Sequence, residues 1–91
     1  MTPDTLTARL AALPAWSSDG KSIRREFRFA DFDATMAFVN AVAAIARRRD
    51  HHPDLEVGYS RVLVAYTSHD VGGLSERDFA SAAEVDALPR P

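Results

Sequence analysis

The sequence lacks cysteine entirely, which excludes disulfide bonds and thiolate metal sites. It also has little excess charge: the formal net charge is −2, so no broad positive field attracts nucleic acid or an anionic membrane. Long apolar runs are missing too, because the longest, residues 41–46, is far shorter than a membrane-spanning helix. The polar start of the chain has no signal-peptide pattern. We therefore expect a cytoplasmic protein without nucleic-acid or membrane partners.

The length and the residue balance indicate one globular domain. Ninety-one residues leave room for a single core, so we expect one domain over residues 1–91. Hydrophobic residues make up 46% and charged residues 26%, which is an ordinary globular balance. A core this small stabilises a monomer only modestly. We therefore expect self-association, as a homodimer or a homotetramer.

Hydrophobic periodicity predicts helices in the first half of the chain. Thr2 followed by Pro3 has the pattern of an N-cap and a first helical residue, and Pro14 stops this helix after a face of three leucines. Asp31 can cap a second helix over residues 31–49. Its apolar residues form two adjacent stripes, one of Phe38, Val42 and Ile45 and the other of Phe32, Met36, Val39 and Ala43. A helix with so broad an apolar face is expected to lie across a sheet.

Alternating residues predict the strands. A short strand is expected near Trp16, a half-buried strand over residues 23–29, and two strands or one bent strand over residues 55–66. Ser75 as N-cap and Asp78 three residues later have the character of a capping box that begins a third helix. The element order is then α-β-β-α-β-β-α. This order predicts an α+β fold with a four-stranded antiparallel sheet covered by helices.

The histidines are the candidate chemical groups. His51 and His52 end the long helix, because Pro53 disfavours helical geometry before it, and His69 is expected at the end of a strand. This α+β layout can bring a helix end and a strand end to one rim of the sheet. Since histidine has an unperturbed pKa of about 6.5, one ring can donate a proton while another accepts. Capping of helix carbonyls and a three-histidine metal site are the alternatives, although adjacent helical residues diverge by about 100°.

Other polar and aromatic residues have simpler explanations. Ser68 beside His69 does not indicate a nucleophile triad, because neighbours on a strand point to opposite faces. Asp78 is accounted for by the first turn of a helix, and Trp16 by the core. The run Arg47–Arg49 is typical of a solvated helix end, with an anion site as the second interpretation.

Several segments together resemble one known family. They are Asp50-His51-His52-Pro53-Asp54, the strand 62–66, and the run from Thr67 through His69 and Gly72-Gly73-Leu74-Ser75-Glu76-Arg77-Asp78 to Phe79. This combination resembles the signature of the pterin-4a-carbinolamine dehydratases, and most closely their bacterial branch. Trp16 and the segment 27–32 also fit, so the resemblance covers nearly the whole chain.

The resemblance implies an enzyme without a metal or an organic cofactor. Family members remove water from the 4a-hydroxytetrahydropterin that aromatic amino acid hydroxylases produce, and the quinonoid dihydropterin is then recycled. The family's three catalytic histidines correspond to His51, His52 and His69, and its acidic residue in the last helix corresponds to Asp78. We expect His51 and His69 to be the acid and base, in either order. The expected substrate-binding residues are His52, Asp70, Asp78 and Trp16.

Two features of the chain bear on this expectation. Many relatives carry a glutamate one helical turn before the first histidine, where this chain has Arg47, so a carboxylate that would orient or charge the site is absent there. Asp50 is the nearest substitute, from a different direction. The second expected function is a non-catalytic one, either as a dimerisation cofactor that uses the helix 31–49 or as a pterin binder associated with a hydroxylase. A scaffold of that kind would tolerate replacement of all three histidines.

Overall fold

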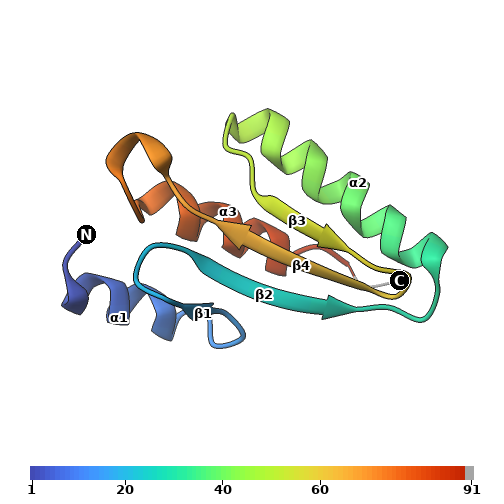
Figure 1. Ribbon diagram of the computed structural model, residues 1–91, viewed down its shortest axis with the longest axis horizontal. Helices are drawn as coiled ribbons and strands as arrows, with labels where there is room; N and C mark the ends of the chain where they lie inside the picture. Colours follow the sequence, from blue (N-terminus) through green and yellow to red (C-terminus); the bar gives the residue numbers. More distant parts are fainter. Residues whose placement is uncertain (90–91) are drawn as a thin grey trace.

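A computed structural model describes residues 1–89, and Figure 1 shows its arrangement. The predicted α+β order is confirmed, with a single turn of 3₁₀ helix, η1, added before the last helix. The elements are α1 (Pro3–Ala11), β1 (Ser17–Ser18), β2 (Ile23–Arg28), α2 (Phe32–Arg49), β3 (Asp54–Val57), β4 (Arg61–Tyr66), η1 (His69–Val71) and α3 (Glu76–Asp86).

The sheet is antiparallel, with strand order β1-β2-β4-β3. Residues 54–66 therefore form two strands joined as a hairpin, rather than one bent strand. Phe27 pairs with Val62 in the register of β2 and β4, and Leu55 pairs with Val64 across β3 and β4. Because side chains alternate across a strand, one face of β4 presents Val62, Val64 and Tyr66, all fully buried.

Helices α2 and α3 cover this buried face of the sheet and pack against each other (Figure 1). The predicted inner stripe of α2, Phe38, Val42 and Ile45, is buried. The second stripe is only partly covered, and Phe32 at its start is 46% exposed. A helix buries about 100° of its circumference against one layer, so the stripe that faces away from β4 and α3 remains accessible.

The helix starts are capped as the sequence predicts. The Thr2 side chain accepts from the amide of Thr5, and Asp31 caps α2 in the same way at Ala34. α2 ends at Arg49, where Asp50 takes the left-handed conformation with φ of 51°. This turn, followed by Pro53, directs the chain from the helix end into β3. None of the helices in residues 1–89 is long and apolar enough to cross a membrane.

The expectation that His69 ends a strand is wrong. β4 ends at Tyr66, and Ser68 instead forms an isolated bridge with Gly73. Reciprocal backbone hydrogen bonds between Ser68 and Gly73, of 2.7 and 3.2 Å, close the loop that contains η1. Gly72 ends η1 with φ of 69°, a conformation that favours glycine. His69 therefore lies on a closed turn rather than on the sheet.

Candidate active site

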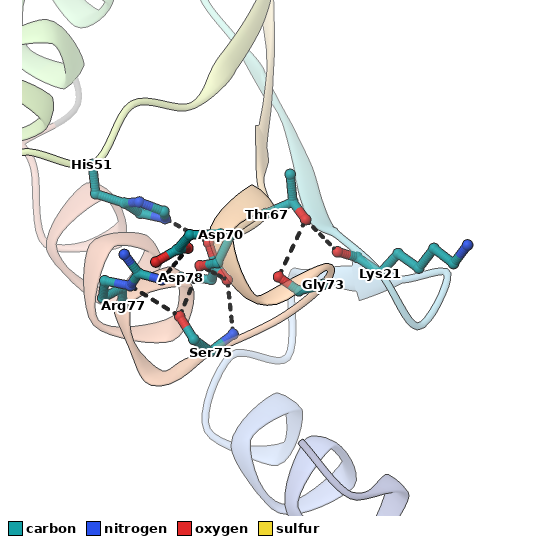
Figure 2. A network of polar contacts seen from close by, with 9 residues as sticks. Lys21, His51, Thr67, Asp70, Gly73, Ser75, Arg77 and Asp78 are labelled. Atoms are coloured by element: carbon teal, nitrogen blue, oxygen red, sulfur yellow. Dashed lines mark hydrogen bonds and ion pairs between the residues drawn. The ribbon is translucent and has the colours of Figure 1, made fainter.

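The centre of the site is a buried pair formed by His51 and Asp78. The Nε2 atom of His51 lies 2.6 Å from Oδ1 of Asp78. The histidine residue is 8% exposed and the aspartate is fully buried. His51 follows the left-handed turn at the end of α2, whereas Asp78 lies in the first turn of α3. In Figure 2 the imidazole points from the end of α2 toward the start of α3. Two segments that are 27 residues apart are thus joined by one side-chain contact.

The other oxygen of Asp78 is held by two donors. Oδ2 accepts from the Ser68 hydroxyl at 2.8 Å and from the backbone amide of Ser75 at 3.0 Å. The second bond is part of the predicted capping box. The same carboxylate therefore caps α3 with one oxygen and contacts His51 with the other. The capping role of Asp78 is confirmed, but it accounts for only part of its hydrogen bonding.

The chemistry of these groups fixes the direction of each hydrogen bond. An ionised carboxylate only accepts, so the Nε2 atom of His51 carries a proton toward Asp78. A neutral His51 then has Nδ1 as its unprotonated nitrogen. Within residues 1–89, Nδ1 has no hydrogen-bond partner. The arrangement leaves one basic nitrogen of a nearly buried imidazole available to a ligand.

Tyr66 supports the imidazole from its face. The two rings stack with centroids 5.7 Å apart and an interplanar angle of 15°. Burial raises the pKa of Tyr66 to about 12, with a smaller contribution from the negative charge of Glu84. The phenol therefore stays protonated across the physiological range. His51 is fixed in its plane by Asp78 and across its plane by Tyr66.

His52 and His69 are exposed, unlike His51. His52 is adjacent to His51 in the chain, and His69 begins η1 next to Asp70. Asp70 lies near enough to His51 for the histidine charge to contribute to lowering its pKa, although its hydrogen bond to Arg77 is the main cause. The His69–Asp70 turn is therefore a neighbour of His51, and Figure 2 shows Asp70 beside the His51–Asp78 pair. Roles for His52 and His69 in catalysis stay predictions.

Asp70 is occupied by a cation of the protein itself. Its Oδ1 atom lies 2.5 Å from Nη2 of Arg77, which in turn donates through Nε to the Ser75 hydroxyl at 3.2 Å. Both charged side chains are exposed, so the ion pair contributes little to stability. A substrate contact at Asp70 would have to share the carboxylate with Arg77.

Trp16 is part of the hydrophobic core. It is 5% exposed, and its Nε1 atom donates to Asp86 at 2.9 Å. Its ring packs edge-on to Phe27 and lies 6.2 Å from the ring of Tyr66. The Tyr66 ring thus lies between Trp16 and His51 in this series of ring contacts, and a role in substrate binding for Trp16 stays a prediction.

The arginine run at the end of α2 is mostly paired with α3. Arg48 donates to Glu84 at 2.5 Å and Arg49 contacts the other oxygen of the same carboxylate. These two guanidinium groups lower the pKa of Glu84. Arg47 has no ion pair within residues 1–89 and is exposed. Ion pairs from Arg48 and Arg49 to Glu84 thus join the end of α2 to α3. Of the three arginines, Arg47 is the one without an ion pair in the described chain.

Two further features bear on ligands. Among residues 1–89, no three histidine, aspartate or glutamate side chains are placed to share a metal ion.

An open hollow of about 400 Å³ lies on the side of the η1 loop that faces α1, lined by Met1, Thr5, Val71, Leu74, Ser75 and Glu76. None of the three histidines lines this hollow. The candidate reactive surface is therefore sought at His51 and the neighbouring His69–Asp70 turn.

Comparisons with known proteins identify the family and agree with the fold. A family model described as pterin 4 alpha carbinolamine dehydratase matches residues 1–88. A Nitrosospira multiformis protein named "Putative pterin-4-alpha-carbinolamine dehydratase" is 50% identical, covering 97% of this chain and 78% of its own. A protein of the same name from Acidobacterium capsulatum is 49% identical, covering 97% of this chain and 96% of its own.

Two solved structures share the fold. One is a transcriptional coactivator/pterin dehydratase from Brucella melitensis, with a TM-score of 0.90 at 34% identity over 96% of this chain and 95% of that one. The other is a pterin dehydratase-like protein identified as a RuBisCO assembly factor in the alpha-carboxysome. Its TM-score is 0.66 at 26% identity over 79% of this chain and 83% of that one. The fold and the family match thus define a small α+β protein of the pterin dehydratase type. The chain belongs to the pterin-4a-carbinolamine dehydratase family, as the resemblance predicted.

Sequence reasoning misses the roles of Ser68 and Tyr66. The sequence raises Ser68 only as a nucleophile, and that role stays excluded because Ser68 is 1% exposed whereas His69 is on the surface. For Tyr66 the alternation of β4 predicts burial but carries no information about the ring stacked on it.

Proposed function

We propose that this protein is a 4a-hydroxytetrahydropterin dehydratase that uses histidines as general acid and base. The observation that carries the proposal is the His51–Asp78 pair, which holds one ring nitrogen protonated and leaves the other free to accept a proton. Membership of the family supports the substrate class. The reaction contributes to recycling tetrahydropterin for aromatic amino acid hydroxylation, with a hydroxylase such as the phenylalanine enzyme as the source of the substrate.

The roles follow from the bonds that must break. Dehydration removes the proton on N5 and the hydroxyl on C4a, and a C4a=N5 double bond forms as water leaves. We assign His51 Nδ1 as the base that takes the N5 proton, because Asp78 holds the proton of its other nitrogen. His69, in its protonated form, is the acid that donates a proton to the departing hydroxyl. Each group contributes typically 10²–10⁴-fold, and solvent exchange restores both protonation states.

We assign the remaining residues to binding. His52 is exposed beside His51 and is proposed to hold the pterin with a smaller contribution to the proton transfers. Asp78 acts on the substrate through His51, because its carboxylate oxygens are already bonded. Asp70 is proposed to contact the substrate only in exchange for part of its bond to Arg77.

The test is the decay of enzymatically generated 4a-hydroxytetrahydropterin, followed by ultraviolet absorbance. The purified protein should accelerate the decay, and a chelator should leave the acceleration unchanged. His69→Ala and His51→Ala should each lower kcat by at least about 100-fold, while His52→Ala should mainly raise KM. Decay at the spontaneous rate with wild-type protein would refute the proposed function.

The second candidate is a non-catalytic binding role. The names of the two similar structures, a coactivator and an assembly factor, favour keeping it. An exposed aromatic pair also lies away from the histidines, where Phe32 at the start of α2 stacks on Tyr59 with centroids 6.0 Å apart. A binding protein of this kind would keep its partner when all three histidines are replaced by alanine. An enzyme would lose turnover in the same variant.

We also propose that the protein self-associates. The stripe of α2 that begins at Phe32 is only partly buried, and a chain of this size gains stability by covering such a surface. Sedimentation velocity should find a dimer or tetramer, and Phe32→Asp should shift it toward the monomer. A wild-type monomer across the accessible concentration range would contradict this proposal.

A further inference from the structure

We propose that Ser68 is a positioning residue for the reaction, acting on His51 through Asp78. The proposal rests on the proposed function for its kinetic part and on the hydrogen-bond network for the rest. Ser68 is 1% exposed, and its hydroxyl makes its hydrogen bonds inside the protein, to Asp78 and Ser75. Its bond to Asp78, at 2.8 Å, is made to Oδ2, whereas His51 contacts Oδ1.

The polarity of the network can be worked out from its two ends. At one end, Asp78 accepts only, so the Ser68 proton must point to it. The oxygen of Ser68 then accepts from the Ser75 hydroxyl, which lies 2.7 Å away. At the other end, the guanidinium of Arg77 only donates, and it donates to the Ser75 oxygen at 3.2 Å. Every proton in the chain Arg77–Ser75–Ser68 therefore points toward Asp78.

This direction of the hydrogen bonds leaves Oδ1 of Asp78 as the acceptor for His51. Two donors on Oδ2 hold the carboxylate in one rotamer and leave Oδ1 for the imidazole. Loss of the Ser68 hydroxyl removes one of these donors and also leaves the Ser75 hydroxyl without its acceptor. Oδ2 is then held by the Ser75 amide alone, so the carboxylate is less firmly oriented as the acceptor that selects the Nε2–H tautomer of the imidazole. Polar partners one shell away from the reacting group typically change function by about 10–100-fold.

Ser81 provides a matched control. It is also a fully buried serine, it lies on α3, and its hydroxyl has no hydrogen-bond partner within the described chain. Ser81→Ala therefore deletes the same atom from the protein interior without touching the network. Ser68→Thr is the conservative variant, because it keeps a hydroxyl at the same position.

The experiment measures kcat and KM for Ser68→Ala, Ser68→Thr and Ser81→Ala, and determines the His51 tautomer by ¹⁵N NMR of the imidazole. We expect Ser68→Ala to lower kcat roughly 10-fold with KM nearly unchanged, and to mix the tautomers. Ser68→Thr should restore both readouts, and Ser81→Ala should alter neither. A folded Ser68→Ala protein with wild-type kcat and tautomer would overturn the inference, and so would an equal loss in Ser81→Ala.

Two further outcomes are informative. If Ser68→Ala does not fold, Ser75→Ala decides, since it removes the donor to Ser68 but keeps the backbone amide bond to Asp78. A smaller loss in the same direction supports the inference, and unchanged kcat and tautomer refute it. If wild-type protein has no dehydratase activity, the proposed function fails while the tautomer measurement still tests Ser68.

Discussion

Replacement of Asp78 by asparagine should invert the tautomer of His51 while preserving most of the shape of the site. The amide oxygen can take the place of Oδ2 and accept from Ser68 and from the Ser75 amide. The amide nitrogen then faces His51 and donates where Oδ1 accepted. His51 must respond with Nε2 as acceptor, which moves its proton to Nδ1. The variant should therefore fold with the imidazole in the opposite tautomer.

The magnitude follows from this inversion. A base nitrogen that carries a proton cannot take another, and loss of the correct tautomer by such an exchange costs about 10⁴-fold in kcat in a histidine–aspartate pair of another enzyme class. The stability cost is smaller, about 1–3 kcal/mol, because hydrogen bonds to a charged group are replaced by neutral ones. For a domain of this size, each kcal/mol lowers Tm by about 4–8 °C. Kinetics must therefore be measured well below the melting range of the variant.

The assay combines stopped-flow dehydration kinetics, thermal unfolding and imidazole ¹⁵N NMR. Asp86→Asn is the matched control, because Asp86 is also on α3 and its carboxylate accepts from Trp16 at 2.9 Å and from Arg25 at 2.7 Å, away from His51. That variant should lose stability and keep kcat within about 2-fold. A folded Asp78→Asn protein that retains more than about one tenth of wild-type kcat would show that the assignment of His51 as base is wrong.

Three further predictions concern stability. The pKa of Tyr66 is raised to about 12 in the folded protein, whereas the unfolded chain ionises near pH ~10. Stability should therefore fall above that pH, by about 2 kcal/mol at pH ~12, and urea unfolding of Tyr66→Phe should show a smaller alkaline loss than wild type. The pKa of Glu84 is lowered by the two arginines of α2, so its stabilising effect is present above the unfolded value and lost as the solution is acidified. The difference in unfolding midpoint between wild type and Glu84→Gln should accordingly shrink at low pH, and a difference that grows would contradict the ion-pair explanation. Gly20 has φ of 93°, with open space where a Cβ would lie. Gly20→Ala should therefore cost about 1 kcal/mol in thermal unfolding through the backbone alone, whereas Gly73→Ala, which also has open space and no positive φ, should cost close to none.

The sequence predicts those parts of the fold that depend on neighbouring residues. The caps at Thr2 and Asp31 and the capping box of α3 are predictable because each is a contact over three residues. The buried stripe of α2 is predictable because helical periodicity is local. The alternation of β4 likewise predicts its buried face.

The site itself is only partly predictable. The three candidate histidines are identified by their chemistry and by the family resemblance, but their unequal burial is not. His51 is nearly buried because α3 supplies a carboxylate to it across 27 residues of sequence, and no local pattern encodes that distance. A local cap is a sufficient explanation for Asp78 in the sequence, so the partner of its second oxygen stays hidden there. Sequence periodicity predicts the local contact of a residue such as a helix cap, but it does not predict a second contact with a residue distant in the sequence.

The way α3 is attached has a consequence for folding kinetics. Its side chains bond to Arg9 across 67 residues, to Trp16 across 70 and to His51 across 27. Contacts of such separation form late, because chain closure must precede any gain from them. During refolding, the helix signal from α2 should therefore recover before the proposed dehydratase activity, which requires α3 to be docked. Recovery of turnover would then report completion of the tertiary structure more faithfully than circular dichroism does.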